Sequence, residues 1–323
     1  MPDFPIKNRE YLSSRHRLSH QQIDTLLNEK YAKNNIAEKL GQLFQVGEFM
    51  ELTDAFREAD IPFTPIKGPI LSYKLHNDAS LRYSHDLDFL MASHDIKKAI
   101  YILENKGYEP GYFPWPSNII KEQRLIKRSN QILFSHPEHQ ISIELHWRLF
   151  GRNMVDSKVI DEVLKKNAES IKFNNRIFQG FNKELELLYL IIHGGLHGWF
   201  RLKWLVDIKD FLENTTINSK KFSQLVTKLN ASRMVALCNA TLAHYFPSSA
   251  LLPCKEVPGT KKRLKFTISQ IEKEDYYTRS VLERIEHFWF RFHCFPGIRY
   301  KWNILAGAFR SIYNDTFKFQ RTF

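Results

Sequence analysis

The stretch YSHDLDFLM, residues 83–91, sets two carboxylates, Asp86 and Asp88, one residue apart and then runs into apolar chain. Neighbouring residues of a β-strand point to opposite faces of a sheet. A strand here therefore directs Leu87 and Phe89 to one face and both acids to the other. Like charges that share a face repel each other unless a proton or a cation lies between them. The segment predicts a strand with one apolar face and one acidic face.

The chain before this strand predicts a helix, an edge strand and a turn. Apolar residues recur with helical spacing between residues 36 and 56, which predicts a packed helix. In ADIPFTPIKGP, residues 59–69, Pro62 and Pro65 exclude a helix, and the alternating apolar residues favour a short strand at a sheet edge. Lys67 and Gly68 follow, and Pro69 suits the first position of a short helix.

The chain after this strand predicts a helix and a hairpin that carries a third acid. SHDIKKAIYILENKGYEP, residues 93–110, is typical of a helix that stops at Gly107. QILFS and ISIELHWRLF flank the turn-like HPEHQ, which predicts a β-hairpin over residues 131–150. In its second strand, Ser142, Glu144 and His146 share the face opposite the apolar residues. Glu144 is therefore a single carboxylate on a strand face.

The pattern becomes helical from residue 182 to the end of the chain. We expect an α+β protein in which a small mixed β-sheet with flanking helices is followed by a helical domain. The predicted division is a helical segment over residues 1–60 that packs on the core, an α/β core over residues 61–175, and a helical domain over residues 176–323. The last domain ends in a basic, aromatic tail.

Composition limits the classes of partner and the cellular setting. Lys and Arg exceed Asp and Glu by 12 in the 323 residues, which favours an anionic partner such as a nucleotide, a nucleic acid or an acidic lipid surface. The three cysteines have neither disulfide-framework nor zinc-site spacing. The N-terminus lacks the apolar core of a signal peptide, and no stretch reaches the roughly 18 apolar residues of a transmembrane helix. We therefore expect a cytoplasmic protein.

The acids point to divalent metal chemistry. Hard carboxylate oxygens suit Mg²⁺ or Mn²⁺, and two such ions roughly 3.5–4 Å apart can clamp the attacking and leaving oxygens of a phosphoryl transfer. A D-x-D pair alone is more often a solvated strand face or a loop cap. The assignment therefore depends on the motifs around the pair.

Those motifs resemble a known family. IKG before a short helix, DLDFL on a strand and a lone carboxylate in SIELHW are similar to the DNA polymerase beta-like nucleotidyltransferase superfamily. PIKGPILSYKLHNDASLRYSHDLDFL, GYEP, IELHW and HGGLHGWFRLKWLVDI together resemble, over roughly residues 40–212, an uncharacterised bacterial nucleotidyltransferase family. Several motifs in the same order are more specific than any one of them.

The resemblance implies a role for each matching residue. Asp86 and Asp88 would bind metal, and Glu144 would be the third ligand and an activator of the acceptor. Gly68 would let the backbone approach a phosphate, and Lys67 would contact a triphosphate. The chain departs from the broad superfamily at Pro69, where Ser or Gly is usual, and in the long gap of sixteen residues between Pro69 and Asp86. The closer family shares the Lys-Gly form and the long gap.

Residues outside the acidic motif leave alternatives open. Arg82 either contacts a phosphate at the site, which we favour, or pairs with the acids. His193 and His197 have the i, i+4 spacing of zinc proteases, but position 194 is Gly and not the Glu that such enzymes need as a base. These histidines either pack at a close helix crossing or, as the resemblance favours, face the nucleotide or the acceptor.

The helical region and the tail carry further cations. We expect Arg201 and Lys203 to face nucleotide or acceptor, although Lys203 and Asp207 also have the spacing of an ordinary helical ion pair. The tail mixes cations with aromatic residues. A buried core with a solvated edge is our favoured interpretation of it. Stacking on nucleic-acid bases and a weak contact with an acidic membrane surface are the alternatives.

The sequence thus predicts an enzyme that moves a nucleoside monophosphate from an NTP, ATP among the candidates, to an acceptor and releases pyrophosphate. Two Mg²⁺ or Mn²⁺ ions are the expected cofactors. The acceptor, whether small molecule, peptide, protein or RNA, is not specified. One alternative is a catalytically inactive nucleotide- or RNA-binding protein on the same fold, at which Pro69 hints. Another is a membrane-surface or complex-forming protein that acts through the tail.

Overall fold

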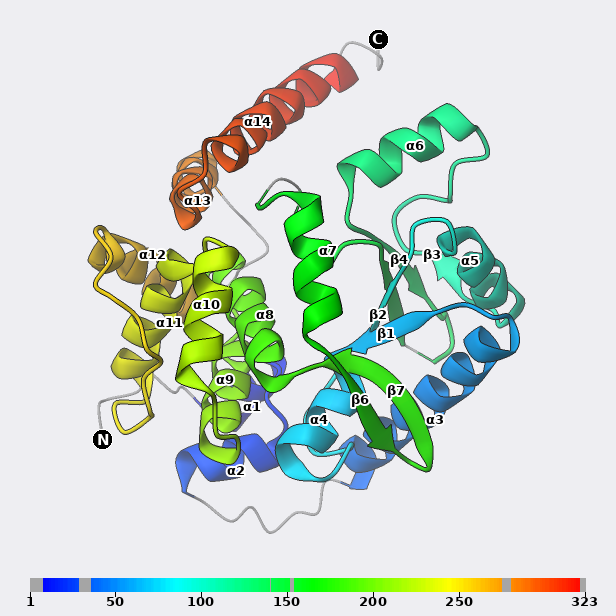
Figure 1. The fold of residues 1–323 in the computed structure, drawn as a ribbon, viewed down its shortest axis with the longest axis horizontal. Coiled ribbons are helices and arrows are strands. Elements are labelled where there is room, and N and C mark those ends of the chain that lie inside the picture. The colour runs from blue at the N-terminus through cyan, green and yellow to red at the C-terminus, as the bar shows by residue number, and fades with distance from the viewer. Residues whose placement is uncertain (1–7, 29–35, 140, 152–153, 275–279, 320–323) are drawn as a thin grey trace. The chain divides into compact units, whose positions relative to one another are not determined.

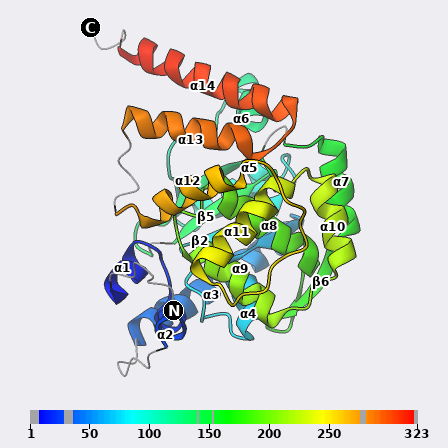
Figure 2. The ribbon, with the colours of Figure 1, turned by 90° about the vertical axis from the view of Figure 1, so that its left-hand side faces the viewer.

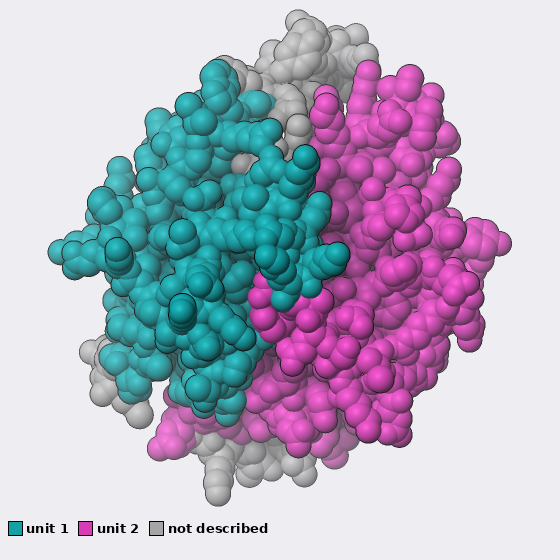
Figure 3. Space-filling view, in the orientation of Figure 1, with its two compact units in different colours: residues 1–6, 152–166, 183–323 teal, residues 7–151, 167–182 magenta. Residues whose placement is uncertain are grey.

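The chain folds as a mixed α/β protein with a small mixed sheet and a helical C-terminal region. The computed structural model describes residues 8–28, 36–139, 141–151, 154–274 and 280–319. Two compact units are distinguished (Figure 3). The sheet unit comprises Lys7–Gly151 and Asn167–Asn182, and the helical unit comprises Met1–Ile6, Arg152–Lys166 and Lys183–Phe323. The predicted boundaries at residues 60 and 175 stay a prediction.

The sheet unit alternates helices and strands along the chain (Figure 1). Its helices are α1 (Arg9–Ser14), α2 (His20–Leu27), α3 (Ile36–Glu58), α4 (Gly68–His76), α5 (Ile96–Asn105) and α6 (Ile119–Arg128). Its strands are β1 (Phe63–Ile66), β2 (Asp86–Met91), β3 (Glu109–Pro110), β4 (Gln131–Ser135), β5 (Ser142–His146), β6 (Ala168–Phe173) and β7 (Arg176–Phe181). Helix α3, strand β2 and the β4–β5 hairpin confirm the predicted elements.

The main sheet has the order β1-β2-β5-β4-β3 within the described residues. Strand β2 pairs with β5 in parallel, and the other neighbours pair antiparallel. Strand β1 forms one edge, which fits Pro65, since proline lacks the N–H that a central strand would use. The mixed pairing brings β2 beside β5, a strand that lies more than fifty residues later in the chain.

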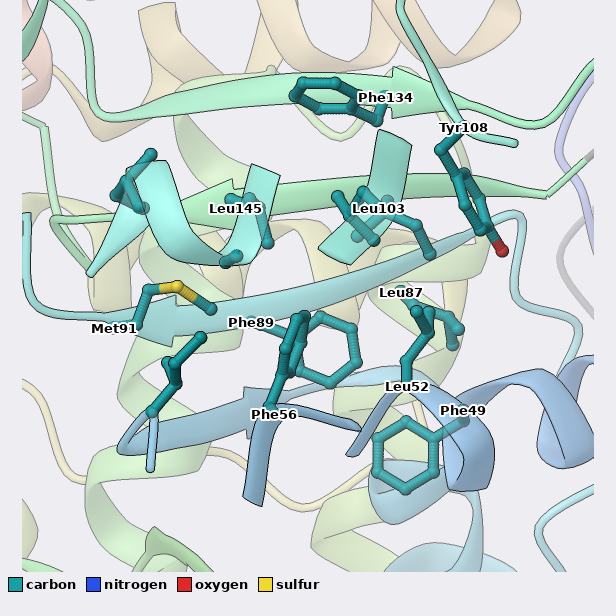
Figure 4. Packing of buried hydrophobic residues seen from close by; sticks show 14 of the residues in the cluster. Phe49, Leu52, Phe56, Leu87, Phe89, Met91, Leu103, Tyr108, Phe134 and Leu145 are labelled. Carbon is teal, nitrogen blue, oxygen red and sulfur yellow. The ribbon is translucent and has the colours of Figure 1, made fainter. Parts of the chain in front are cut away.

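One face of the sheet is covered by α3 and α5. Phe89 of β2 stacks on Phe49, with ring centroids 5.8 Å apart, and meets Phe56 edge to face at 5.3 Å. Leu145 and Phe134 continue this apolar layer across β5 and β4 (Figure 4). Burial of this face fixes the register, since a slip of one residue would turn every apolar side chain toward the opposite face.

A second hairpin, β6–β7, belongs to the sheet unit and was not predicted. Phe173 and Phe178 of the hairpin join the same apolar core. The Arg57 guanidinium of α3 donates to the Ile177 carbonyl at 2.7 Å and lies 4.5 Å from the ring centroid of Phe178. The Lys74 ammonium of α4 donates to the Phe181 carbonyl at 3.0 Å. The hairpin therefore packs on α3 and α4 within the sheet unit, although in sequence it follows α7 (Ser157–Lys166), which belongs to the other unit.

The helical unit is built around α8 and α11, which pack against each other (Figure 2). Its helices are α7 (Ser157–Lys166), α8 (Lys183–Leu196), α9 (Lys203–Asn214), α10 (Ser219–Lys228), α11 (Ser232–Tyr245), α12 (Thr260–Glu272), α13 (Val281–Cys294) and α14 (Ile298–Phe319). Helix α8 begins one residue after the predicted start of the helical region. Among the described residues, no helix combines the length and the apolar character that crossing a bilayer requires.

We predict that Phe56→Ala lowers the free energy of unfolding by about 3–5 kcal/mol, because it removes a fully buried ring from between α3 and the sheet. Chemical denaturation followed by circular dichroism measures the change. Leu40→Ala on the same helix is the control, since Leu40 is 60% exposed and should change stability little. Equal effects of the two substitutions would contradict the packing described for α3.

Candidate active site

The turn from β1 into α4 has an unusual backbone. Lys67 has φ 58° and ψ −131°, and Gly68 has φ 51°, so two successive residues adopt positive φ. A side chain strains this region, which is why glycine suits position 68. Pro69 lies in the first turn of α4, where a missing N–H costs no helical hydrogen bond. The turn leaves the N-terminus of α4, the positive end of its dipole, at the end of β1.

The parallel register of β2 and β5 brings two acids together. Asp88 is directly opposite Glu144, and Asp86 is opposite Ser142. In-register residues of adjacent strands share a face, so Asp86, Asp88, Glu144 and His146 all lie on the face away from Phe89. The apolar side chains between them are buried in the core. The alternation that buries one face therefore gathers the acids on the other.

Asp88 is the centre of a buried polar network. Its Oδ1 lies 2.9 Å from Nε2 of His146, and its Oδ2 lies 3.4 Å from Nζ of Lys67. Nε2 of His146 also lies 3.2 Å from Oε2 of Glu144. The Asp88 side chain is 1% exposed, against 22% for Glu144. Glu144 is thus the member of the network that solvent reaches most.

Burial and charge shift the pKa values of this network. Burial alone would raise the pKa of Asp88, but the Lys67 ammonium and the hydrogen bond with His146 hold it well below its usual range. Burial alone would lower the pKa of His146, but its bonds to Asp88 and Glu144 raise it to about 9. Burial raises the pKa of Glu144, and the charges of Asp88 and Asp86 add to this effect. The Asp88 carboxylate and the His146 imidazole therefore stabilise each other's charged forms.

The same groups form a candidate metal site. Single donor atoms of Asp88, Glu144 and His146 all lie within 4.8 Å of one another. Asp86 shares their strand face but is not a member of this set. His146 was given no role in the sequence analysis, although strand alternation had already placed it on the face of Glu144. The signal that would have found it is its position two residues after the acid.

Arg82 lies in the connection between α4 and β2 and is 2% exposed. Its backbone N–H donates to Oγ of Ser72 at 3.1 Å, which anchors this connection to α4. The Ser72 hydroxyl in turn donates to the Asp78 carbonyl at 2.7 Å. Arg82 is therefore buried on the segment that leads into β2. Its proposed contact with a phosphate stays a prediction.

The other predicted residues lie in the helical unit. His193 and His197 have ring centroids 5.0 Å apart, and each lies against the ring of Trp204, at 5.3 and 5.2 Å. The Arg201 guanidinium is 5.7 Å from the centroid of the same Trp204. Lys203 is 7% exposed on α9. Phe200 packs edge to face on Trp204, with ring centroids 4.9 Å apart. We give the name histidine–tryptophan cluster to these five side chains: His193, His197, Phe200, Arg201 and Trp204.

The glycines beside these histidines serve packing. A Cβ atom on Gly194 would lie 2.5 Å from Nε1 of Trp199, and one on Gly195 would lie 2.8 Å from Sδ of Met234. Both positions therefore need glycine so that the end of α8 can pack closely against Trp199 and α11. This agrees with the close crossing considered for the motif. His193 and His197 are not completely buried, and His197 is exposed.

Comparison with known proteins decides the family. Residues 13–247 match the family described as uncharacterised nucleotidyltransferase. The chain belongs to this family. The matched region contains the whole acidic network and the histidine–tryptophan cluster. The family is the one that the sequence motifs resembled, and its description supports transferase chemistry in general.

Two other comparisons add little. Among solved structures, the chain is similar to the lincosamide antibiotic adenylyltransferase LnuA with lincomycin bound, at 15% identity and a TM-score of 0.34. That similarity covers 52% of this chain and 97% of the other. No match is found among curated proteins.

We predict that Gly68→Ala lowers the free energy of unfolding of the protein by about 1–2 kcal/mol, since Gly68 has φ 51° and alanine is strained there. Gly41→Ala on α3 is the matched control, because nothing lies within 4 Å of its added Cβ. The control should raise stability by about 0.5–1 kcal/mol. Denaturant titration of both variants checks the opposite signs, and stabilisation by Gly68→Ala would contradict the turn geometry.

Proposed function

We propose that this chain transfers a nucleoside monophosphate from an NTP to an acceptor and releases pyrophosphate. The observation that carries this proposal is the juxtaposition of Asp88 and Glu144 across the parallel strands β2 and β5. Membership of the nucleotidyltransferase family supports it. A buried face of converging carboxylates is otherwise costly, so the arrangement is better explained by ligand binding than by stability.

The residues present fit divalent cations. Asp88 and Glu144 offer carboxylate oxygens, and Asp86 adds a third acid on the same strand face. These three would hold Mg²⁺ or Mn²⁺, two ions in the proposed site, as sequence analysis predicts. When bound, such ions supply charge neutralisation at the triphosphate and at the attacking oxygen.

The β1–α4 turn supplies the proposed phosphate grip. Gly68 lets the backbone come close to a phosphate, and the N-terminus of α4 favours negative charge there. Lys67, which pairs with Asp88, has a flexible stem that can turn its ammonium to the phosphates. Arg82 is proposed as a second cation for the triphosphate. Pro69 removes one backbone donor from this grip.

Glu144 is the proposed proton acceptor. Its raised pKa and partial exposure suit a carboxylate that takes a proton from the acceptor hydroxyl. In the proposed step the acceptor oxygen bonds to the α-phosphorus, the bond from that phosphorus to the pyrophosphate oxygen breaks, and the hydroxyl proton passes to Glu144. Asp88 stays ionised throughout, because its pKa is held well below neutral.

The histidine–tryptophan cluster is proposed to contact the nucleotide or the acceptor. His193, His197 and Arg201 surround the Trp204 ring, and such a cationic, aromatic group can hold a planar or anionic ligand. Lys203 is proposed as a further contact on α9. The acceptor stays open among small molecules, peptides, proteins and RNA ends.

We predict that metal-dependent pyrophosphate release falls by more than about a hundredfold in each of three variants, Asp86→Ala, Asp88→Ala and Glu144→Ala. Each substitution removes a proposed ligand of the metal ions that would neutralise charge in the transition state. Glu109→Gln on strand β3 is the matched control, because Glu109 is an exposed acid of the same sheet. A coupled pyrophosphate assay with mixed NTPs and hydroxyl acceptors measures the rates. Circular dichroism confirms that the variants fold.

Wild-type-like turnover by Asp86→Ala would contradict this assignment of the acids. The inactive alternative gives a different result: calorimetry would show NTP binding, and no acceptor would yield pyrophosphate. Pro69→Ser then tests the reason, since it restores a hydroxyl and a backbone N–H at the phosphate grip. A gain of turnover would identify Pro69 as the cause of inactivity.

The tail favours a second candidate function, contact with an acidic membrane surface. Phe290 of α13 is buried and stacks on Phe266 of α12 at 4.3 Å, so one face of α13 packs on the helical unit. The other face leaves Val281, Leu282 and Trp289 exposed at 73%, 66% and 51%. Residues 281–323 hold seven Lys and Arg against three Asp and Glu, a net charge of +4. Exposed tryptophan beside cations is typical of helices that lie on anionic lipid.

We predict that the protein sediments with vesicles of phosphatidylcholine and phosphatidylserine at low salt and much less with phosphatidylcholine alone. Trp289→Ala should weaken this binding, because it removes exposed aromatic area from α13. Tyr101→Ala is the control, since Tyr101 is 66% exposed on a helix of the sheet unit. Absence of sedimentation at low salt would dismiss the membrane candidate.

A further inference from the structure

His146 introduces a nitrogen donor into a set of carboxylates. Its Nε2 lies 2.9 Å from Oδ1 of Asp88 and 3.2 Å from Oε2 of Glu144. The imidazole is 8% exposed and is carried by β5, so strand geometry fixes where it points. The ring nitrogen therefore lies between the two oxygens that the proposed metal site needs.

These distances fit donors of one ion. Adjacent ligands of an octahedral ion with bonds of about 2.1 Å lie about 3.0 Å apart. Both distances from Nε2 are near this value, and the donor atoms of Asp88, Glu144 and His146 all lie within 4.8 Å of one another. Coordination would require Nε2 of His146 to release its proton to solvent, and the ion would then replace that proton between the same two oxygens.

Neutralising Asp88 does not by itself explain where His146 lies. Lys67 already supplies a cation to Asp88, on Oδ2, the oxygen that His146 does not contact. The position of His146 matters instead for Oδ1 and for Glu144, since it touches both. A residue that only orients a metal ligand hydrogen-bonds to that one ligand from outside the coordination shell. Nε2 of His146 instead contacts an oxygen of each of two proposed ligands.

We propose that His146 is a metal ligand and that it makes this site select a first-row transition ion, represented by Mn²⁺, over Mg²⁺. The inference rests on the proposed function, because it concerns the same metal site. Imidazole is a softer donor than carboxylate and binds transition ions better than Mg²⁺, which prefers oxygen ligands and retains its waters. Mn²⁺ is the weakest binder of the transition series, so it provides the most demanding comparison.

Calorimetry on the full chain, alone and with a non-hydrolysable NTP, tests the selectivity. The wild type should bind Mn²⁺ at least about tenfold more tightly than Mg²⁺. His146→Gln should weaken Mn²⁺ binding by about tenfold or more and change Mg²⁺ binding less than about threefold, because the amide offers an oxygen in place of the nitrogen. His94→Gln is the matched control, since His94 has a side chain 81% exposed in the same unit. Equal loss of both ions in His146→Gln would overturn the inference.

Pulsed electron paramagnetic resonance of bound Mn²⁺ gives a readout that is independent of activity. The wild type and His94→Gln should show ¹⁴N modulation from a coordinated imidazole, and His146→Gln should lack it. Absence of ¹⁴N modulation in the wild type would overturn the inference even if His146→Gln fails to fold. Turnover with Mg²⁺ and no nitrogen coupling would reject the ligand role and keep the proposed function. Conversely, ¹⁴N coupling in a protein that transfers no nucleotide with any ion would keep the ligand role and reject the proposed function.

Discussion

The parallel pairing of β2 with β5 is the constraint on which the candidate site depends. This register sets Asp88 opposite Glu144, and the apolar face packed under α3 and α5 holds the register in place. A slip of one residue would bury the acids and expose Leu87 and Phe89. The core and the site are thus two faces of one pattern. The free energy that buries the apolar face also pays for bringing two carboxylates together.

The converging acids are tolerated because cations lie within the same layer. Lys67 and His146 approach different oxygens of Asp88, and each comes from a separate strand end. A carboxylate that is 1% exposed would be strongly destabilising if it lacked such partners. The positive-φ turn at Lys67 and Gly68 aims the lysine at this place. Backbone strain at the turn and charge compensation at Asp88 are therefore parts of one arrangement.

Alternation in the sequence predicted that Asp86 and Asp88 share one face of their strand. It also predicted that Glu144 points away from the apolar face of its own strand. It could not predict strand pairing, because periodicity within a segment does not say which segments are neighbours. The β6–β7 hairpin was missed for a related reason: it returns to the sheet unit after α7. His146 was seen on the right face but not assigned, since only the register shows that its ring reaches Asp88. Family resemblance added roles, and structure added distances.

Both oxygens of Asp88 have partners within the protein, Lys67 on one and His146 on the other. A cation that binds Asp88 must therefore displace or join at least one of these groups. A polyphosphate offers Lys67 another anion, which lowers the cost of releasing it from Asp88. A ligand that draws Lys67 away from Asp88 would therefore raise the affinity of the site for the cation. By linkage, the cation would raise the affinity for that ligand by the same factor. Under the proposed function, the Lys67–Asp88 contact would therefore couple the binding of nucleotide and of metal.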